Sequence, residues 1–119
     1  RFERIPPCFQ RFVEIVAEVE PVHVLSGPDH AAAQARQMLA HINNVTIHDV
    51  VTNDIWIRDY GPTFVLDRHS RKMVAVDWKF NAWGGKHPPW DEDAANASRI
   101  ANLLEVEVSS SDLTCEGGG

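Results

Sequence analysis

Short β-branched segments alternate with segments of helical apolar spacing along most of this chain of 119 residues. Apolar residues at helical spacing predict helices over about 8–20, 31–42 and 92–104. β-branched and apolar runs predict strands at 22–25, 45–51, 63–66, 73–80 and 106–108, with the start of another at 113–116. Helices and short strands in this order predict an α/β fold.

Local signals mark several ends of these segments. Pro21 follows the first helical segment and is predicted to end it, because proline cannot continue a helix. Asp29 and Asp91 each precede a helical segment and are predicted to be N-caps. The polar segment 67–72 lies between two predicted strands and is typical of a hairpin connection.

The stretch 53–64, N-D-I-W-I-R-D-Y-G-P-T-F, places charged residues among apolar ones. Burying charges costs free energy unless they are paired or bind a charged ligand. Pro62 fixes its own φ and biases Gly61 away from the helical region, so we expect a turn followed by a strand. Polar residues on a loop at a strand end are a common site arrangement.

Two interpretations of this stretch are open. In the first, Arg58 pairs with Asp54 or Asp59 and Trp56 is a core residue. In the second, a carboxylate and an aromatic face bind a guanidinium ion, since carboxylates match its planar geometry and aromatic faces attract cations. Trp56 and Asp59 are three residues apart around the expected turn, so they can converge on one ligand.

Length and composition bound the class of protein. A chain of 119 residues suits one modest domain, and its net charge of −6 disfavours nucleic acid as a partner. No apolar run approaches the roughly 18 residues that a membrane span needs. Two cysteines, Cys8 and Cys115, are too few for a disulfide framework and predict reduced thiols in a cytoplasmic protein.

Other chemistries find little support in the sequence. The six histidines lack the spacing of a zinc or iron site. The glycines at 84–85 and 117–119 lack a phosphate-binding fingerprint. Cys115 has no identifiable partner base, so a structural thiol is the favoured interpretation for it. Cys8 lies at a predicted helix start, which can lower the pKa of a thiol, but nothing else around it indicates a site.

Three motifs in order resemble the agmatine deiminase family, whose members include bacterial peptidylarginine deiminases. They are the stretch 53–64, F-N-A-W-G-G-K at 80–86 and E-G-G at 116–118. The resemblance implies a pentein fold, an α/β propeller of repeated strand-helix units. It also implies hydrolysis of agmatine to N-carbamoylputrescine and ammonia, on the route to putrescine, with no metal or organic cofactor.

The resemblance also implies roles for individual residues. Asp59 would bind the substrate guanidinium, and Trp56 would form one side of the same pocket. Glu116 would orient a catalytic histidine. Asn81 and Trp83 would either line the pocket or pack beneath it. Arg58 is expected to form a structural ion pair.

The family's catalytic cysteine and its His-x-Asp segment would both lie beyond Gly119. We therefore expect residues 1–119 to be the N-terminal part of one deiminase domain, without a second domain and inactive by itself. The nucleophile role is not assigned to Cys8 or Cys115.

Three alternatives are open. The first is a peptidylarginine deiminase of the same fold. The second is a non-catalytic cation-binding module, and the third is an unrelated α/β domain whose charges serve only folding. The expected partner is a small cationic guanidino compound, with no nucleic acid and no membrane, and a homo-oligomer is compatible with the sequence.

Overall fold

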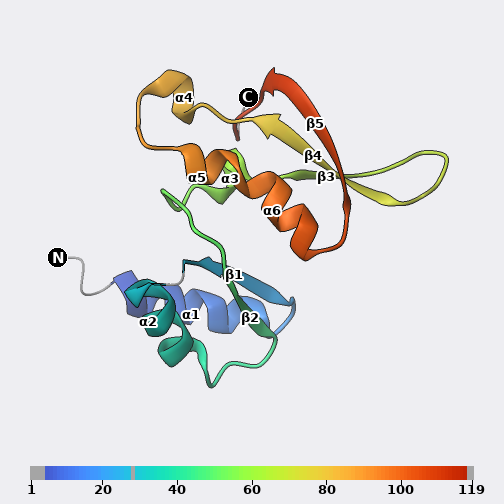
Figure 1. Cartoon of the computed structure of the whole chain (residues 1–119). Coiled ribbons are helices and arrows are strands. Elements are labelled where there is room, and N and C mark those ends of the chain that lie inside the picture. The colour runs from blue at the N-terminus through green and yellow to red at the C-terminus, as the bar shows by residue number, and fades with distance from the viewer. Residues whose placement is uncertain (1–4, 28, 118–119) are drawn as a thin grey trace. The chain divides into compact units, whose positions relative to one another are not determined.

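The computed structural model describes residues 5–27 and 29–117, and the chain divides into two compact units at residues 1–51 and 52–119 (Figure 1). Helices and strands are mixed along the chain, which confirms the α/β class, and short helices also form at Ile57–Tyr60 and Ala82–Gly85. In the described residues, no helix combines the length and the apolar character that crossing a membrane requires. The prediction that residues 1–119 belong to a single domain stays a prediction.

The first unit is built on two parallel strands, β1 (Val22–Ser26) and β2 (Val45–Asp49). Helix α2 (His30–Leu39) connects them, as parallel neighbours require a crossover. The Asp29 side chain accepts a hydrogen bond from the Ala31 N–H at 2.9 Å, which confirms the predicted N-cap.

Helix α1 (Ile5–Ala17) begins three residues before the predicted start at Cys8. Pro6 and Pro7 lie in its first turn, where backbone N–H groups have no helical partner, so proline costs nothing there. The helix ends before Pro21, as expected.

The second unit contains a three-stranded sheet in the order β3-β4-β5. Strands β3 (Thr63–Leu66) and β4 (Met73–Lys79) form the predicted antiparallel hairpin. Its connection is held by Asp67, whose Oδ1 accepts from the His69 N–H at 3.1 Å and the Ser70 N–H at 2.6 Å. Strand β5 (Glu107–Thr114) runs parallel to β4.

Strand β5 corrects one prediction. A separate strand starting at 113–116 does not form, because β5 continues to Thr114, which pairs with Lys79 after a register shift between Asp77 and Lys79. The available partner edge, rather than the local sequence, decides where the strand ends.

The predicted helix over 92–104 is two helices, α5 (Asp91–Ala94) and α6 (Asn96–Leu103). Asp91 is not the N-cap: it lies in the first turn of α5, and Trp90 occupies the cap position. The acceptor comes from Asn53 instead, whose Oδ1 accepts from the N–H groups of Glu92 at 2.9 Å and Asp93 at 3.1 Å.

The core of the second unit contains residues from the stretches 53–64 and 80–86. Tyr60, Phe80 and Ala82 are buried together, and Trp83 and Trp90 pack against them. Helix α6 covers the sheet next to them and buries Ala97 and Ala101 against β4 and β5.

Replacing Ala101 with leucine should destabilise the protein by about 1–3 kcal/mol, because Ala101 is fully buried and the extra carbons have no space. Urea denaturation measures the effect. The neighbouring Asn102→Leu is the matched control: Asn102 is exposed, so its effect should stay within about 0.5 kcal/mol. Equal stability of the two variants would contradict this packing of α6.

Candidate functional site

A left-handed turn, α4 (Ala82–Gly85), lies at the centre of the second sequence motif. The four residues have φ angles of 52°, 56°, 80° and 75°. The Gly85 N–H donates to the Asn81 carbonyl at 2.7 Å and closes the turn. Glycine adopts this conformation freely, but Ala82 and Trp83 each carry a cost of roughly 1–2 kcal/mol.

Two side chains stabilise this turn. The Asn81 Oδ1 accepts from the Gly84 N–H at 2.7 Å. The Glu116 Oε1 accepts from the Trp83 N–H at 2.9 Å and the Asn81 N–H at 3.3 Å. A hydrogen bond to a charged group contributes about 1.5–3 kcal/mol, the same order as the strain. Glu116 therefore holds the backbone that places Trp83, and its predicted action on a histidine stays a prediction.

The two tryptophans predicted for the pocket are neighbours. Trp56 is half exposed and directly precedes the short helix α3 (Ile57–Tyr60). Its ring meets that of Trp83 edge to face, with centroids 6.5 Å apart. Trp83 also packs edge to face on the buried Phe80, at 5.8 Å. Trp83 thus both packs on the core and faces Trp56.

Asp59 lies in α3, three residues after Trp56, and is half-buried. Its N–H donates to the Trp56 carbonyl at 2.9 Å, so both residues belong to one tight turn of backbone. The chain after β5 approaches the same helix: a Cβ added to Gly117 would lie 2.8 Å from the Arg58 Cγ and 3.0 Å from its carbonyl oxygen. All three motifs therefore meet within the second unit.

The predicted ion pair of Arg58 with Asp54 or Asp59 is wrong. No such pair joins these described residues; Arg58 is exposed and its side-chain stem lies against Gly117. Adjacent helical positions such as 58 and 59 point in different directions, which separates the two charges. Asp54 instead uses its Oδ1 to accept from the Ile55 N–H at 2.7 Å.

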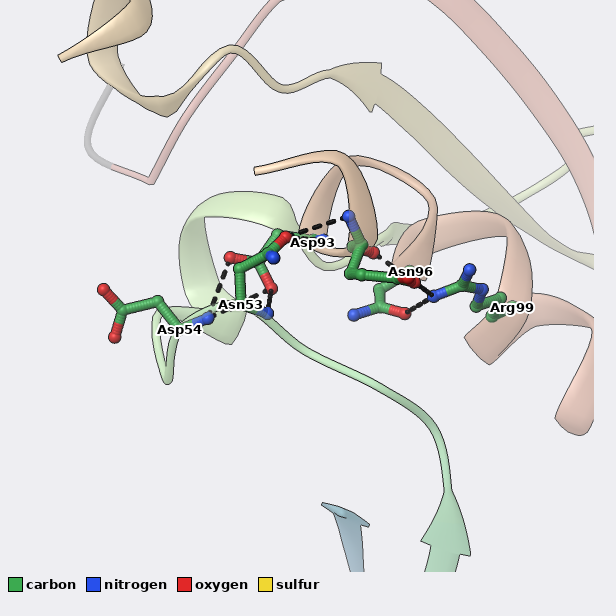
Figure 2. Close-up of polar contacts among 6 residues, drawn as sticks. Asn53, Asp54, Asp93, Asn96 and Arg99 are labelled. Atoms are coloured by element: carbon green, nitrogen blue, oxygen red, sulfur yellow. Dashed lines mark hydrogen bonds and ion pairs between the residues drawn. The ribbon is translucent and has the colours of Figure 1, made fainter. Parts of the chain in front are cut away.

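Sequence reasoning missed a buried carboxylate, Asp93, which exchanges hydrogen bonds with the start of the first motif (Figure 2). Its Oδ1 accepts from the Asn53 N–H at 2.7 Å, and its Oδ2 accepts from the Asp54 N–H at 3.1 Å. Burial raises the pKa of Asp93, these N–H groups lower it, and the nearby charges of Asp54 and Asp91 raise it further. Asp93 precedes the buried Ala97 by four residues, so extending that helical face backwards could have identified it.

Tyr60 connects the first motif to the core. Its hydroxyl donates to the Asp54 carbonyl at 3.0 Å, and its ring packs edge to face on Phe80 at 5.9 Å. Burial, followed by the charges of Asp93 and Asp54, raises the pKa of Tyr60 to about 12. The phenol is therefore neutral and a donor throughout the physiological range.

A cavity of about 360 Å³ opens beside these groups. Of the five residues predicted for the site, only Trp83 lines this cavity. The residues that line the cavity are Asn53, Asp54, Phe80, Ala82, Trp83, Lys86, His87, Pro88, Pro89, Trp90 and Asp93. Within the described residues, no group of three or more histidine, cysteine or acidic side chains could hold a metal ion. Cys8 and Cys115 are exposed free thiols.

Comparison with known proteins places the whole chain in one group. A family model described as Porphyromonas-type peptidyl-arginine deiminase matches residues 1–119. A Streptococcus mutans protein provisionally named agmatine deiminase is 36% identical over 119 residues, covering 93% of this chain and 31% of that protein. The chain thus spans about a third of the length of this relative.

Solved structures of agmatine deiminases have the same fold over this segment. The Enterococcus faecalis enzyme, described as catalysing its reaction, superposes with a TM-score of 0.82 at 28% identity, covering 98% of this chain and 32% of that chain. A cysteine-to-serine variant of the C. jejuni enzyme with substrate bound gives a TM-score of 0.84 at 30% identity, covering 98% and 33%.

Substituting Glu116 by alanine should free the backbone N–H groups of Trp83 and Asn81. Their hydrogen exchange should accelerate by about tenfold or more, since each loses a charge-assisted bond. Glu116→Gln should have a smaller effect because it keeps an acceptor oxygen. Glu107→Ala, an exposed glutamate on β5, is the control. Unchanged exchange at Trp83 in Glu116→Ala would show that Glu116 does not hold the turn.

The raised pKa of Tyr60 predicts a loss of stability at alkaline pH. The unfolded chain releases this proton near pH 10 and the folded chain near pH 12, so the free energy of unfolding should fall across that interval. Tyr60→Phe should remove this part of the pH dependence. Because Tyr60 is the sole tyrosine of these 119 residues, the difference in tyrosinate absorbance between the protein and this variant isolates it. A native midpoint near 10 would contradict the buried placement.

Proposed function

Because the chain belongs to the Porphyromonas-type peptidyl-arginine deiminase family, we propose that the protein containing it hydrolyses a guanidinium C–N bond. Agmatine is the favoured substrate, with N-carbamoylputrescine and ammonia as products on the route to putrescine. The relatives named agmatine deiminase, one of them with substrate bound, support this choice. In this proposal the chain forms part of a pentein propeller.

One observation carries the proposal: the Glu116 carboxylate, the Asn81–Trp83 backbone and the Trp56 ring are brought together. These groups come from three segments that are far apart in the sequence. A carboxylate beside aromatic rings suits a flat delocalised cation, because both attract positive charge and the rings shield it from water.

Asp59 is the group proposed to bind the guanidinium. It follows Trp56 by one turn of α3 and is half-buried, so its carboxylate is partly withdrawn from water. A carboxylate accepts two parallel N–H bonds from a guanidinium, which fixes both the position and the plane of the cation. Trp56 then forms the side of the pocket against which this plane lies.

Glu116 has a free oxygen for a second partner. Both of its hydrogen bonds within residues 5–27 and 29–117 end on Oε1. We assign Oε2 to the catalytic histidine, which would act as general acid and base from a part of the protein outside this chain. The fixed carboxylate would set the orientation and charge of that imidazole.

The nucleophile in this proposal is a cysteine thiolate from the remaining two thirds of the protein. It attacks the guanidinium carbon while the carboxylates hold the guanidinium nitrogens. The histidine protonates one nitrogen, whose C–N bond breaks so that ammonia leaves. Water deprotonated by the same histidine then attacks the carbon and breaks the C–S bond, which releases the ureido product and restores the thiolate. The substrate-bound C. jejuni enzyme is a cysteine-to-serine variant, which supports a thiol in this role. A reduced thiol suits a cytoplasmic location, and residues 1–119 alone would be inactive.

Peptidyl-arginine is the second candidate substrate, because the matching family model is described by that activity. The two substrates differ at the end remote from the guanidinium, which is a free ammonium in agmatine and a peptide backbone in peptidyl-arginine. Comparing kcat/KM for agmatine and for a blocked arginine peptide decides between them.

Asp59→Asn in the complete protein should lower kcat/KM for the guanidino substrate by about a hundredfold or more, because it removes a charge-assisted bidentate contact. The control is Asp112→Asn, an exposed carboxylate on strand β5, which should retain normal kinetics. Steady-state measurement of ammonia release gives both values. Near-normal kcat/KM for Asp59→Asn would refute the role.

A further inference from the structure

We propose that Asn53 and Asp93 act together as positioning residues for the guanidinium site, by fixing the backbone that carries Trp56 and Asp59. This inference rests on the proposed function of those two residues. Neither Asn53 nor Asp93 would touch the substrate guanidinium; they would act through the segment between them and it.

The side chains of Asn53 and Asp93 each accept hydrogen bonds from backbone N–H groups of the other residue's segment (Figure 2). The Asp93 carboxylate accepts from the backbone N–H groups of Asn53 and Asp54, at 2.7 and 3.1 Å. In return, the Asn53 Oδ1 accepts from the N–H groups of Glu92 and Asp93 at the start of α5. The pair therefore joins two segments about forty residues apart through groups that cannot be satisfied locally.

The bonds continue from this pair to the substrate-binding residues. The Ile55 N–H donates to the Asp54 Oδ1 at 2.7 Å, and the Ile57 N–H donates to the Ile55 carbonyl at 2.8 Å. The Tyr60 hydroxyl closes the segment on the Asp54 carbonyl at 3.0 Å. Residues 53–60 are thus fixed at one end by Asp93 and at the other by a phenol buried against Phe80.

The helix that carries Asp93 is itself well supported. The Arg99 Nη1 donates to the Glu92 Oε2 at 2.6 Å and to the buried Asn96 Oδ1 at 3.2 Å. Helix α6, which follows, packs on β4 and β5. The hydrogen bonds of Asn53 and Asp93 therefore hold the segment that carries Trp56 and Asp59 in a fixed position relative to the sheet.

A carboxylate is needed at position 93 because both facing groups are donors. Asp93 is 3% exposed, and a buried carboxylate requires hydrogen-bond partners, which these two N–H groups supply. Asparagine has nearly the same shape but directs one N–H₂ group at these donors, which breaks one contact without opening a cavity. Asp93→Asn therefore loosens the segment 53–60 with little change in packing.

The test compares Asp93→Asn with Asp91→Asn in the complete protein. Asp91 lies in the same first turn of α5 but is exposed, so its variant should match the unchanged protein. KM and kcat for the guanidino substrate, thermal midpoints, and the affinities of a guanidino ligand and its neutral ureido analogue are measured. We expect Asp93→Asn to raise KM about tenfold or more and to reduce the preference for the cation by a similar factor.

A merely structural role would lower kcat through a smaller folded fraction and leave KM and ligand preference unchanged. That result, or Asp93→Asn behaving like Asp91→Asn, overturns the inference while the proposed function stands. If the complete protein without any substitution neither binds nor hydrolyses guanidino compounds, the proposed function itself is overturned. Should Asp93→Asn fail to fold, Asn53→Ala replaces it, because it keeps the carboxylate on the backbone N–H groups and removes only the bonds to α5.

Discussion

Carboxylates that accept hydrogen bonds from backbone N–H groups hold the candidate site together. Glu116 accepts from Asn81 and Trp83 and stabilises a left-handed turn that two non-glycine residues would otherwise avoid. Asp93 accepts from Asn53 and Asp54 and fixes the start of the segment that carries Trp56 and Asp59. In both cases a side chain from a distant segment supplies the acceptor that an irregular loop lacks. The loops thereby gain a defined shape without regular secondary structure.

The sequence predicts the elements whose shape depends on neighbouring residues better than those whose shape depends on residues far along the chain. Elements governed by local chemistry form as expected: Asp29 caps α2, Asp67 closes the β3–β4 hairpin, and Pro62 follows an extended Gly61 with φ of −73°. Elements whose hydrogen-bond partners lie far away in the sequence differ from the prediction. The helix after Trp90 takes its cap from Asn53, and β5 extends as far as β4 offers a partner. A sequence pattern carries information about the first kind and very little about the second.

The same division applies to the site. Motif order indicates that Trp56, Trp83 and Glu116 belong together, and the ring contact and the Glu116 hydrogen bonds bring them together. The predicted ion pair of Arg58 with Asp54 or Asp59 does not form among the described residues, because nearness in sequence does not determine the direction in which a side chain points on a helix. Asp93 belongs to a run of three acidic residues at 91–93, which by itself looks like a solvated helix start. Its burial follows from the helical face of Ala97, four residues further on, and composition alone does not indicate that face.

The most direct test of the account is a crystal structure of the complete protein with a bound guanidino ligand. The account predicts that the Asp59 carboxylate accepts two hydrogen bonds from the guanidinium and that the Trp56 ring lies against its plane. Glu116 should keep its bonds to Asn81 and Trp83 while its second oxygen contacts a histidine. A ligand bound elsewhere, with Asp59 directed into solvent, would contradict the central claim that these three motifs form one guanidinium site.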